Sequence, residues 1–157
     1  MIKYMTTLLV VEDIQRSRRF YEDLLGMKLE IDLGVNVGFQ GGLAIHLKDH
    51  FQGLMGGPER FPIVFGAHYG ELYFETDEIE AFFQRLKQED VAFVHEIVEQ
   101  PWGQRVMRFY DPDRHVIEIG EQMEAVFVRM NSQGFTAQQI QQKTGMPLEF
   151  VEAVLKG

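Results

Sequence analysis

The sequence contains no cysteine, and this absence excludes two kinds of chemistry. Without cysteine there is no disulfide framework and no thiolate nucleophile, and a metal site has to use histidine, carboxylate or neutral oxygen ligands. No apolar run approaches the roughly 20 residues that a membrane-spanning helix requires, and the N-terminus lacks the apolar centre of a secretion signal. These absences favour a cytoplasmic protein that does not enter a membrane.

Positive charge is also scarce. The chain has 15 Lys and Arg against 24 Asp and Glu, which gives a formal net charge of -9. Proteins that bind nucleic acid do so through clustered Lys and Arg, so the charge balance argues against a nucleic-acid partner. What is present is 157 residues with 45% hydrophobic content, enough for one compact domain with its own core.

The chain consists of two similar halves and a tail. Each half begins with a β-rich run, continues with a helical pattern of apolar residues and ends with three short strand-like segments. In the first half these are residues 6–11, 12–27, 28–32, 35–40 and 43–49, and in the second half 71–76, 77–90, 92–98, 104–110 and 115–120. The pattern predicts two β-α-β-β-β modules, about 3–50 and 68–122, joined by a glycine-rich linker at 51–67.

Four polar positions have equivalent places in the two halves. Thr6 and Glu71 lie in the first strand of each half, and His46 and Glu118 lie in the last, each flanked by aliphatic residues. Because side chains alternate across a strand, these polar residues face away from the aliphatic side. If the aliphatic faces pack under the helices, the four side chains are predicted to converge on one open face.

Two segments carry a family resemblance. "VVEDIQRSRRFYEDLLGMKL" and "RFYDPDRHVIEIG" resemble the vicinal oxygen chelate superfamily, which includes glyoxalases, bleomycin resistance proteins and extradiol dioxygenases. The resemblance implies an α+β fold for residues 1–122, in which two βαβββ modules form a cupped mixed sheet, often within a homodimer. It also implies a divalent metal held by the first and last strands of each module.

The resemblance places the metal ligands at Thr6, His46, Glu71 and Glu118. Threonine is a poor ligand, so His46, Glu71 and Glu118 are expected to hold the ion, which could be Zn, Ni, Mn or Fe. The pair of histidines with one carboxylate expected for an extradiol dioxygenase is absent, and this argues against that chemistry.

The implied activity is that of a glyoxalase I-type lyase or isomerase acting on a small oxygenated substrate. A metal would stabilise an enediolate while Glu118 removes a proton next to a carbonyl. In the first alternative, Glu71 and Glu118 instead pair with Arg105 or Arg108 inside a polar cup. In the second, the protein sequesters a drug or antibiotic without a metal, as resistance members of the superfamily do.

Other residues give weaker signals. Thr6, Tyr73, Trp102 and Arg105 are candidate substrate contacts, although an aromatic residue beside a loop proline, such as Trp102, is more often a packing anchor. The remaining histidines have no equivalent in the other half, and we interpret them as surface or loop residues: His50, His68, His95 and His115.

The tail from residue 123 to 157 lies outside the resemblance and has a helical pattern. Thr136 is a candidate N-cap and Gly145 a candidate turn between two helices. The second of these carries two glutamates and one lysine, which argues against reading DNA bases. The tail is therefore predicted to be a helical hairpin that packs on the sheet or on a partner subunit.

Overall fold

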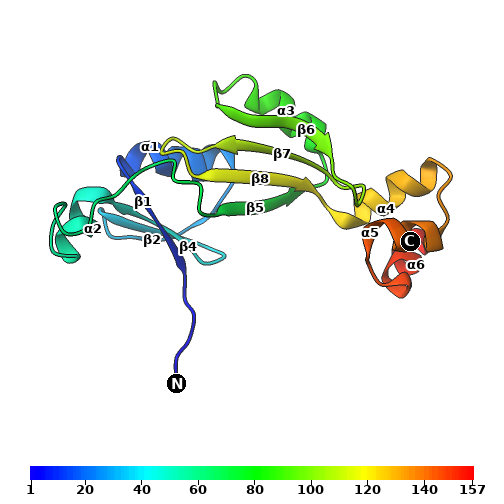
Figure 1. Cartoon of the computed structure of the whole chain (residues 1–157), viewed down its shortest axis with the longest axis horizontal. Coiled ribbons are helices and arrows are strands. Elements are labelled where there is room, and N and C mark those ends of the chain that lie inside the picture. The colour runs from blue at the N-terminus through cyan, green and yellow to red at the C-terminus, as the bar shows by residue number, and fades with distance from the viewer. The chain divides into compact units, whose positions relative to one another are not determined.

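The computed structural model describes all of residues 1–157, and the chain divides into two compact units (Figure 1). Unit 1 comprises residues 1–68 and 111–115, and unit 2 comprises residues 69–110 and 116–157. Each unit contains one four-stranded sheet.

Unit 1 follows the order predicted for the first half. Its elements are β1 (Thr7–Val11), α1 (Ile14–Arg19), the π-helical turn η1 (Phe20–Leu24), β2 (Leu29–Asp32), β3 (Asn36–Phe39), β4 (Leu43–Leu47) and α2 (Lys48–Leu54). The sheet order is β1-β4-β3-β2, with β1 parallel to β4 and the other pairs antiparallel. Asp13 caps α1 by accepting a hydrogen bond from the backbone N–H of Arg16.

Unit 2 repeats this order and adds three helices. Its elements are β5 (Glu71–Thr76), α3 (Ile79–Leu86), β6 (Phe93–Glu99), β7 (Arg105–Tyr110), β8 (Val116–Glu121), α4 (Met123–Ser132), α5 (Ala137–Thr144) and α6 (Leu148–Lys156). The sheet order is β5-β8-β7-β6, and again the first strand is parallel to the last. The predicted α+β fold with a repeated β-α-β-β-β order is confirmed.

The turn between β7 and β8 belongs to unit 1 and is anchored there by two buried aspartates. Asp111 accepts hydrogen bonds from the Tyr21 hydroxyl at 2.8 Å and from His115 Nδ1 at 2.8 Å. Asp113 pairs with Arg16 at 2.6 Å and accepts from the Ser17 hydroxyl at 3.1 Å. These contacts fix the "DPDRH" turn against α1 and η1, and they satisfy carboxylates that would be costly to bury alone.

The sheet of unit 2 has one apolar face, covered by a helix. Met107, Phe109, Ile117 and Ile119 are almost fully buried on it. α3 contributes Ile79, Leu86 and Phe83, and the Phe83 ring meets that of Phe93 edge-on with ring centroids 5.5 Å apart. The alternation of side chains along β8 therefore leaves Glu118, which lies between Ile117 and Ile119, on the other face.

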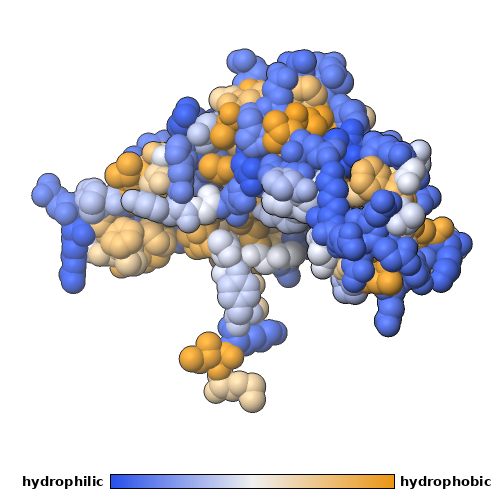
Figure 2. All heavy atoms as spheres, turned by 45° about the vertical axis from the view of Figure 1, so that its right-hand side comes forward, coloured by the Kyte–Doolittle hydropathy of each residue, from blue (hydrophilic) through white to orange (hydrophobic).

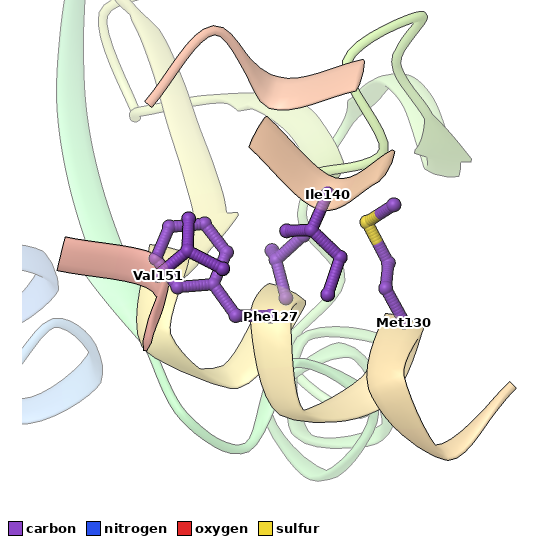
Figure 3. Close-up of a cluster of buried hydrophobic side chains, with 5 residues drawn as sticks. Phe127, Met130, Ile140 and Val151 are labelled. Atoms are coloured by element: carbon purple, nitrogen blue, oxygen red, sulfur yellow. The ribbon is translucent and has the colours of Figure 1, made fainter. Parts of the chain in front are cut away.

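The three C-terminal helices enclose a small core of their own. Figure 3 shows the side chains of Phe127, Met130, Ile140 and Val151 pointing toward one another from α4, α5 and α6. Thr136 forms a capping box with Gln139 at the start of α5, and Gly145 ends this helix at φ 73° in the left-handed region. The predicted helical hairpin is confirmed as α5 and α6, and α4 precedes it.

No helix is both long enough and apolar enough to cross a bilayer. On the face drawn in Figure 2, hydrophilic residues predominate and hydrophobic residues form separate patches.

The core of the three C-terminal helices leads to the first prediction. Phe127→Ala should lower the free energy of unfolding by about 3–5 kcal/mol, because Phe127 is 0% exposed and its truncation leaves a cavity. The neighbouring Val128 is 54% exposed, so Val128→Ala should change the same quantity by less than about 0.5 kcal/mol. Urea unfolding followed by circular dichroism measures both, and equal effects of the two substitutions would contradict the packing described above.

Candidate functional site

A row of polar side chains crosses the open face of the unit 2 sheet. The strand register aligns Tyr73 on β5 with Glu118 on β8, Glu118 with Arg108 on β7, and Arg108 with His95 on β6. Glu71 lies two residues before Tyr73 and so on the same face. The sheet geometry therefore gathers two of the predicted metal ligands and one predicted substrate contact on one surface.

Arg108 is the centre of this row. Its Nε donates to Glu71 Oε2 at 2.8 Å, its Nη2 pairs with Glu118 Oε2, and its Nη1 lies 3.2 Å from His95 Nε2. The His95 Nδ1 is 2.8 Å from the carbonyl oxygen of Glu96, an acceptor, so Nδ1 carries the ring proton and Nε2 accepts from Arg108. One guanidinium thus contacts side chains from three other strands.

The ion pair with Arg108 explains why Glu118 can lie among core residues. The residue is 6% exposed, and a carboxylate with so little access to water needs a compensating charge. Arg108 supplies that charge and shares it with Glu71, whose side chain is 39% exposed. The alternative in which an arginine pairs with both glutamates is confirmed, and Arg108 is that arginine.

Tyr73 and Trp102 are connected through Gln104, a residue that the sequence patterns did not single out. The Trp102 indole donates to Gln104 Oε1 at 3.1 Å, and Gln104 Nε2 donates to the Tyr73 hydroxyl at 2.8 Å. The Tyr73 hydroxyl in turn donates to Glu75 Oε1 at 2.8 Å. Gln104 is 5% exposed, so it holds two more exposed aromatic side chains from a buried position.

Gly120 makes room for this arrangement. A Cβ atom at this position would lie 2.9 Å from Gln104 Nε2 and 3.0 Å from the Tyr73 hydroxyl. Both distances are too short for a carbon atom beside these groups, so the absence of a side chain at Gly120 allows Tyr73 and Gln104 to meet over β8.

Arg105 faces the opposite side of the sheet from Arg108, because the two residues are three positions apart on β7 and side chains alternate along a strand. It pairs with Glu80 of α3 and with Glu121. Glu121 also receives hydrogen bonds from Arg129 of α4, with Arg129 Nη2 at 2.7 Å. The side chain of Glu121 is 3% exposed, so this cluster is a buried ionic connection between the sheet and α4.

A hollow of about 490 Å³ lies beside this cluster within unit 2. Its walls combine the ionic cluster with the exposed side of α4, and they are formed by Asp77, Arg105, Glu121, Glu124, Ala125, Val128, Arg129 and Ser132. The arginines in its wall are already paired with carboxylates, so the hollow offers no free positive charge to an anion.

In unit 1, His46 lies between two polar partners. Its Nδ1 is 3.0 Å from Asn36 Nδ2, and its Nε2 is 2.7 Å from His50 Nδ1. Burial, followed by the proximity of His50, lowers the pKa of His46 below its ordinary value of 6.5. Thr6 is exposed just before β1, and its hydroxyl donates to the carbonyl of Thr7 at 3.1 Å.

The fit of a metal ion to these residues can be judged within each unit. No group of three or more His, Cys, Asp or Glu side chains in either unit is arranged to hold an ion. Glu71 and Glu118 already share a guanidinium, and a second cation at the same carboxylates would meet like-charge repulsion. These two side chains therefore do not fit a metal as they stand, and the ligand set with His46 stays a prediction.

The interpretation of the other histidines was wrong for His95, which is half-buried within β6 and contacts Arg108. His50 is exposed, as expected, but it also contacts His46. Neither contact has a local sequence signal, because one depends on the helical geometry after β4 and the other on the register between β6 and β7. Gln104 was missed for the same reason.

One of the comparisons with known proteins identifies the family. The model of the glyoxalase-like domain matches residues 4–124. A solved structure of a protein of unknown function from Agrobacterium tumefaciens str. C58 is 37% identical, with a TM-score of 0.67, and the match covers 78% of this chain and 95% of that one. No curated protein matches the chain.

Two more distant structures share the fold. A glyoxalase/bleomycin resistance protein/dioxygenase from Nocardioides is 21% identical, with a TM-score of 0.62 and coverage of 77% of this chain and 83% of that one. A lactoylglutathione lyase from Agrobacterium tumefaciens is 22% identical, with a TM-score of 0.57 and coverage of 74% and 91%. At these identities the likeness concerns the fold alone.

Glu121 leads to a prediction about stability and pH. Burial raises the pKa of Glu121, but hydrogen bonds from Arg105 and Arg129 outweigh it and hold the pKa below its ordinary value of 4.5. Glu121→Gln should therefore cost about 3 kcal/mol of unfolding free energy at pH 7, because it leaves two arginines without their shared carboxylate.

The sign of the pH dependence follows from the lowered pKa. The contribution of Glu121 is fully present above about pH 4.5 and is lost as the pH falls through the lower value of the folded protein. Urea unfolding of the wild type and of Glu121→Gln at a series of pH values should show the difference between them shrinking below pH 4.5. A difference that stays constant down to pH 3 would contradict this account.

Gln104 leads to a prediction that fluorescence can follow. Trp102 is the one tryptophan of the chain, so its emission reports on this site alone. Gln104→Ala removes the acceptor of the indole N–H, and the emission maximum should shift to the red as the ring becomes more exposed to water. Gln100→Ala, at a half-buried position before the Trp102 turn, is the matched control. A red shift as large for Gln100→Ala would show that Gln104 does not hold the ring.

Proposed function

Because the chain belongs to the glyoxalase-like family of the vicinal oxygen chelate superfamily, we propose that it binds a small molecule on the open face of unit 2. We infer further that this binding needs no divalent metal at Glu71 and Glu118. The observation that carries the proposal is the position of Arg108, whose guanidinium contacts both carboxylates.

Electrostatics favour metal-independent binding over a metal-dependent lyase or isomerase activity. The guanidinium is a permanent cation in proteins, and here it lies directly between the two carboxylates. A divalent ion bound to the same two carboxylates would lie within a few ångströms of that charge, where the repulsion is strong in a partly buried site. The carboxylates are thus already compensated without a metal.

The charges on the open face indicate the chemistry of the ligand. Glu71, Glu75 and Glu118 carry three negative charges, and Arg108 offsets one of them. Tyr73 is 48% exposed beside them and presents an aromatic surface. A cationic molecule with a flat or apolar part fits this combination, because the carboxylates attract its charge and the ring stacks on it. A glyoxalase/bleomycin resistance protein/dioxygenase from Nocardioides shares the fold.

A metal-dependent lyase or isomerase of the glyoxalase I type is the second candidate. The family and the lactoylglutathione lyase of similar fold support it. In this reaction Glu118 would act as the base, and its carboxylate would have to give up the ion pair with Arg108 before it could accept a proton. This step is the reason for preferring the binding function.

A homodimer and a cytoplasmic location also remain proposals. The family resemblance supports the dimer, and light scattering at working concentration tests it. A mass equal to one chain of 18.2 kDa would contradict it.

Calorimetry on protein freed of metal with EDTA tests the proposed function. Bleomycin and other cationic antibiotics are the probes, and Trp102 fluorescence gives a second signal. We expect binding that is unchanged by added Zn²⁺, Ni²⁺ or Mn²⁺ and that weakens at least about ten-fold in Glu71→Gln and in Tyr73→Ala, since each removes one part of the recognition surface. Glu30→Gln, an exposed carboxylate of unit 1, is the control.

The hemithioacetal of methylglyoxal and glutathione serves as the probe for the second candidate, because its isomerisation forms S-lactoylglutathione. Formation of this thioester, or antibiotic binding that appears only after a divalent metal is added, would overturn the proposal in favour of the lyase. If none of the antibiotics binds, either with or without added metal, the proposed binding function is also contradicted.

A further inference from the structure

We propose that Arg108 is a built-in cation that closes a latent metal site formed by Glu71, His95 and Glu118, and that removing its charge opens this site to a divalent ion. The inference rests on the proposed metal-independent function and explains how the sheet of unit 2 retains metal-binding side chains without using them.

The three side chains surround one guanidinium. They come from β5, β6 and β8, and each contacts a different nitrogen of Arg108: Nε for Glu71, Nη1 for His95 and Nη2 for Glu118. Their ligand atoms therefore border the volume that the guanidinium fills. His95 is absent from the pattern that the two halves share, so only the register between β6 and β7 brings it here.

The side chains are chemically suited to a metal. Two carboxylates and one imidazole form a set that Zn²⁺ and Mn²⁺ accept, with water completing the coordination. His95 already has the required tautomer, because the contact of Nδ1 with the Glu96 carbonyl at 2.8 Å leaves the lone pair of Nε2 facing Arg108. A backbone carbonyl in this role is a usual support for a metal-binding histidine.

Arg108 keeps this set closed for two reasons. Its charge repels a second cation, and the two carboxylates and the imidazole around it are not arranged to hold an ion. The Glu71 and His95 contacts to the guanidinium measure 2.8 and 3.2 Å, whereas a zinc ion requires ligand distances of about 2.0–2.2 Å. The ligands therefore have to move inward, and they can do so only when the guanidinium is gone.

Truncation of Arg108 removes the cation that compensates the charge of Glu118. Glu118 is 6% exposed and would remain as a buried carboxylate without its ion pair. A divalent ion that binds the folded protein and not the unfolded chain would then raise the melting temperature. The inference thus predicts a protein that is weakened by the substitution and restabilised by metal.

Thermal unfolding and calorimetry of the full chain test this. Arg108→Ala should melt at a lower temperature than the wild type in EDTA and should regain several degrees with excess Zn²⁺ or Mn²⁺. It should bind one ion per chain. The further substitutions His95→Gln or Glu118→Gln should each weaken this binding by about ten-fold or more. Arg108→Lys, which keeps the charge, should bind no added ion.

Matched controls define the outcomes. Adding Glu124→Gln, an exposed carboxylate elsewhere in unit 2, to Arg108→Ala should leave metal binding unchanged. If Arg108→Ala does not fold, Arg108→Gln tests the same loss of charge with more of the side-chain volume retained. The inference is overturned if a folded, uncharged variant binds no more metal than the wild type. It is also overturned if the metal binding of that variant is unchanged by His95→Gln and Glu118→Gln.

The result can be separated from that of the proposed function. If the wild type binds its antibiotic probe without metal but the uncharged variants take up no ion, the latent site is refuted and the binding function stands. If the wild type itself binds one ion per chain through Glu71, His95 and Glu118, both proposals fail.

Discussion

The architecture of unit 2 depends on buried carboxylates of β8 that are neutralised by arginines of β7. Glu118 faces the open side of the sheet and pairs with Arg108, while Glu121 faces the helices and pairs with Arg105. Because the two arginines are three positions apart on β7, the alternation of side chains places them on opposite faces. One strand thus supplies a cation for the candidate site and a cation for Glu121, which also pairs with Arg129 of α4. Each pair makes tolerable a charge that burial alone would make very costly.

The fold could be predicted from the sequence to a large extent, since its signals are local. The apolar stripe that begins at Ile79 and the alternation around Glu118 depend only on residue spacing, and both halves carry the same order. The caps at Thr136 and Gly145 were equally readable, because each acts within one turn of its helix. These features required no knowledge of which strand lies beside which.

The candidate site could be predicted only in part, because its contacts depend on strand register. The choice between Arg105 and Arg108 as partner of Glu118 follows from the alignment of β7 with β8, and the role of His95 follows from the alignment of β6 with β7. Bulges interrupt the register of β6, so counting residues along this strand would have misplaced His95. Gln104 has no sequence signal at all, because its importance comes from the space above Gly120.

The segment that carries the family resemblance also explains why membership in the family leaves the activity open. In "RFYDPDRHVIEIG", Asp111 and Asp113 bind Tyr21, Ser17 and Arg16 and thereby hold the turn in place. These contacts stabilise the fold. The chemistry depends on which side chains occupy the open faces of the strands, and there Arg108 of β7 pairs with both Glu71 and Glu118. Membership in the family therefore specifies the fold of this sheet without specifying the chemistry on its open face.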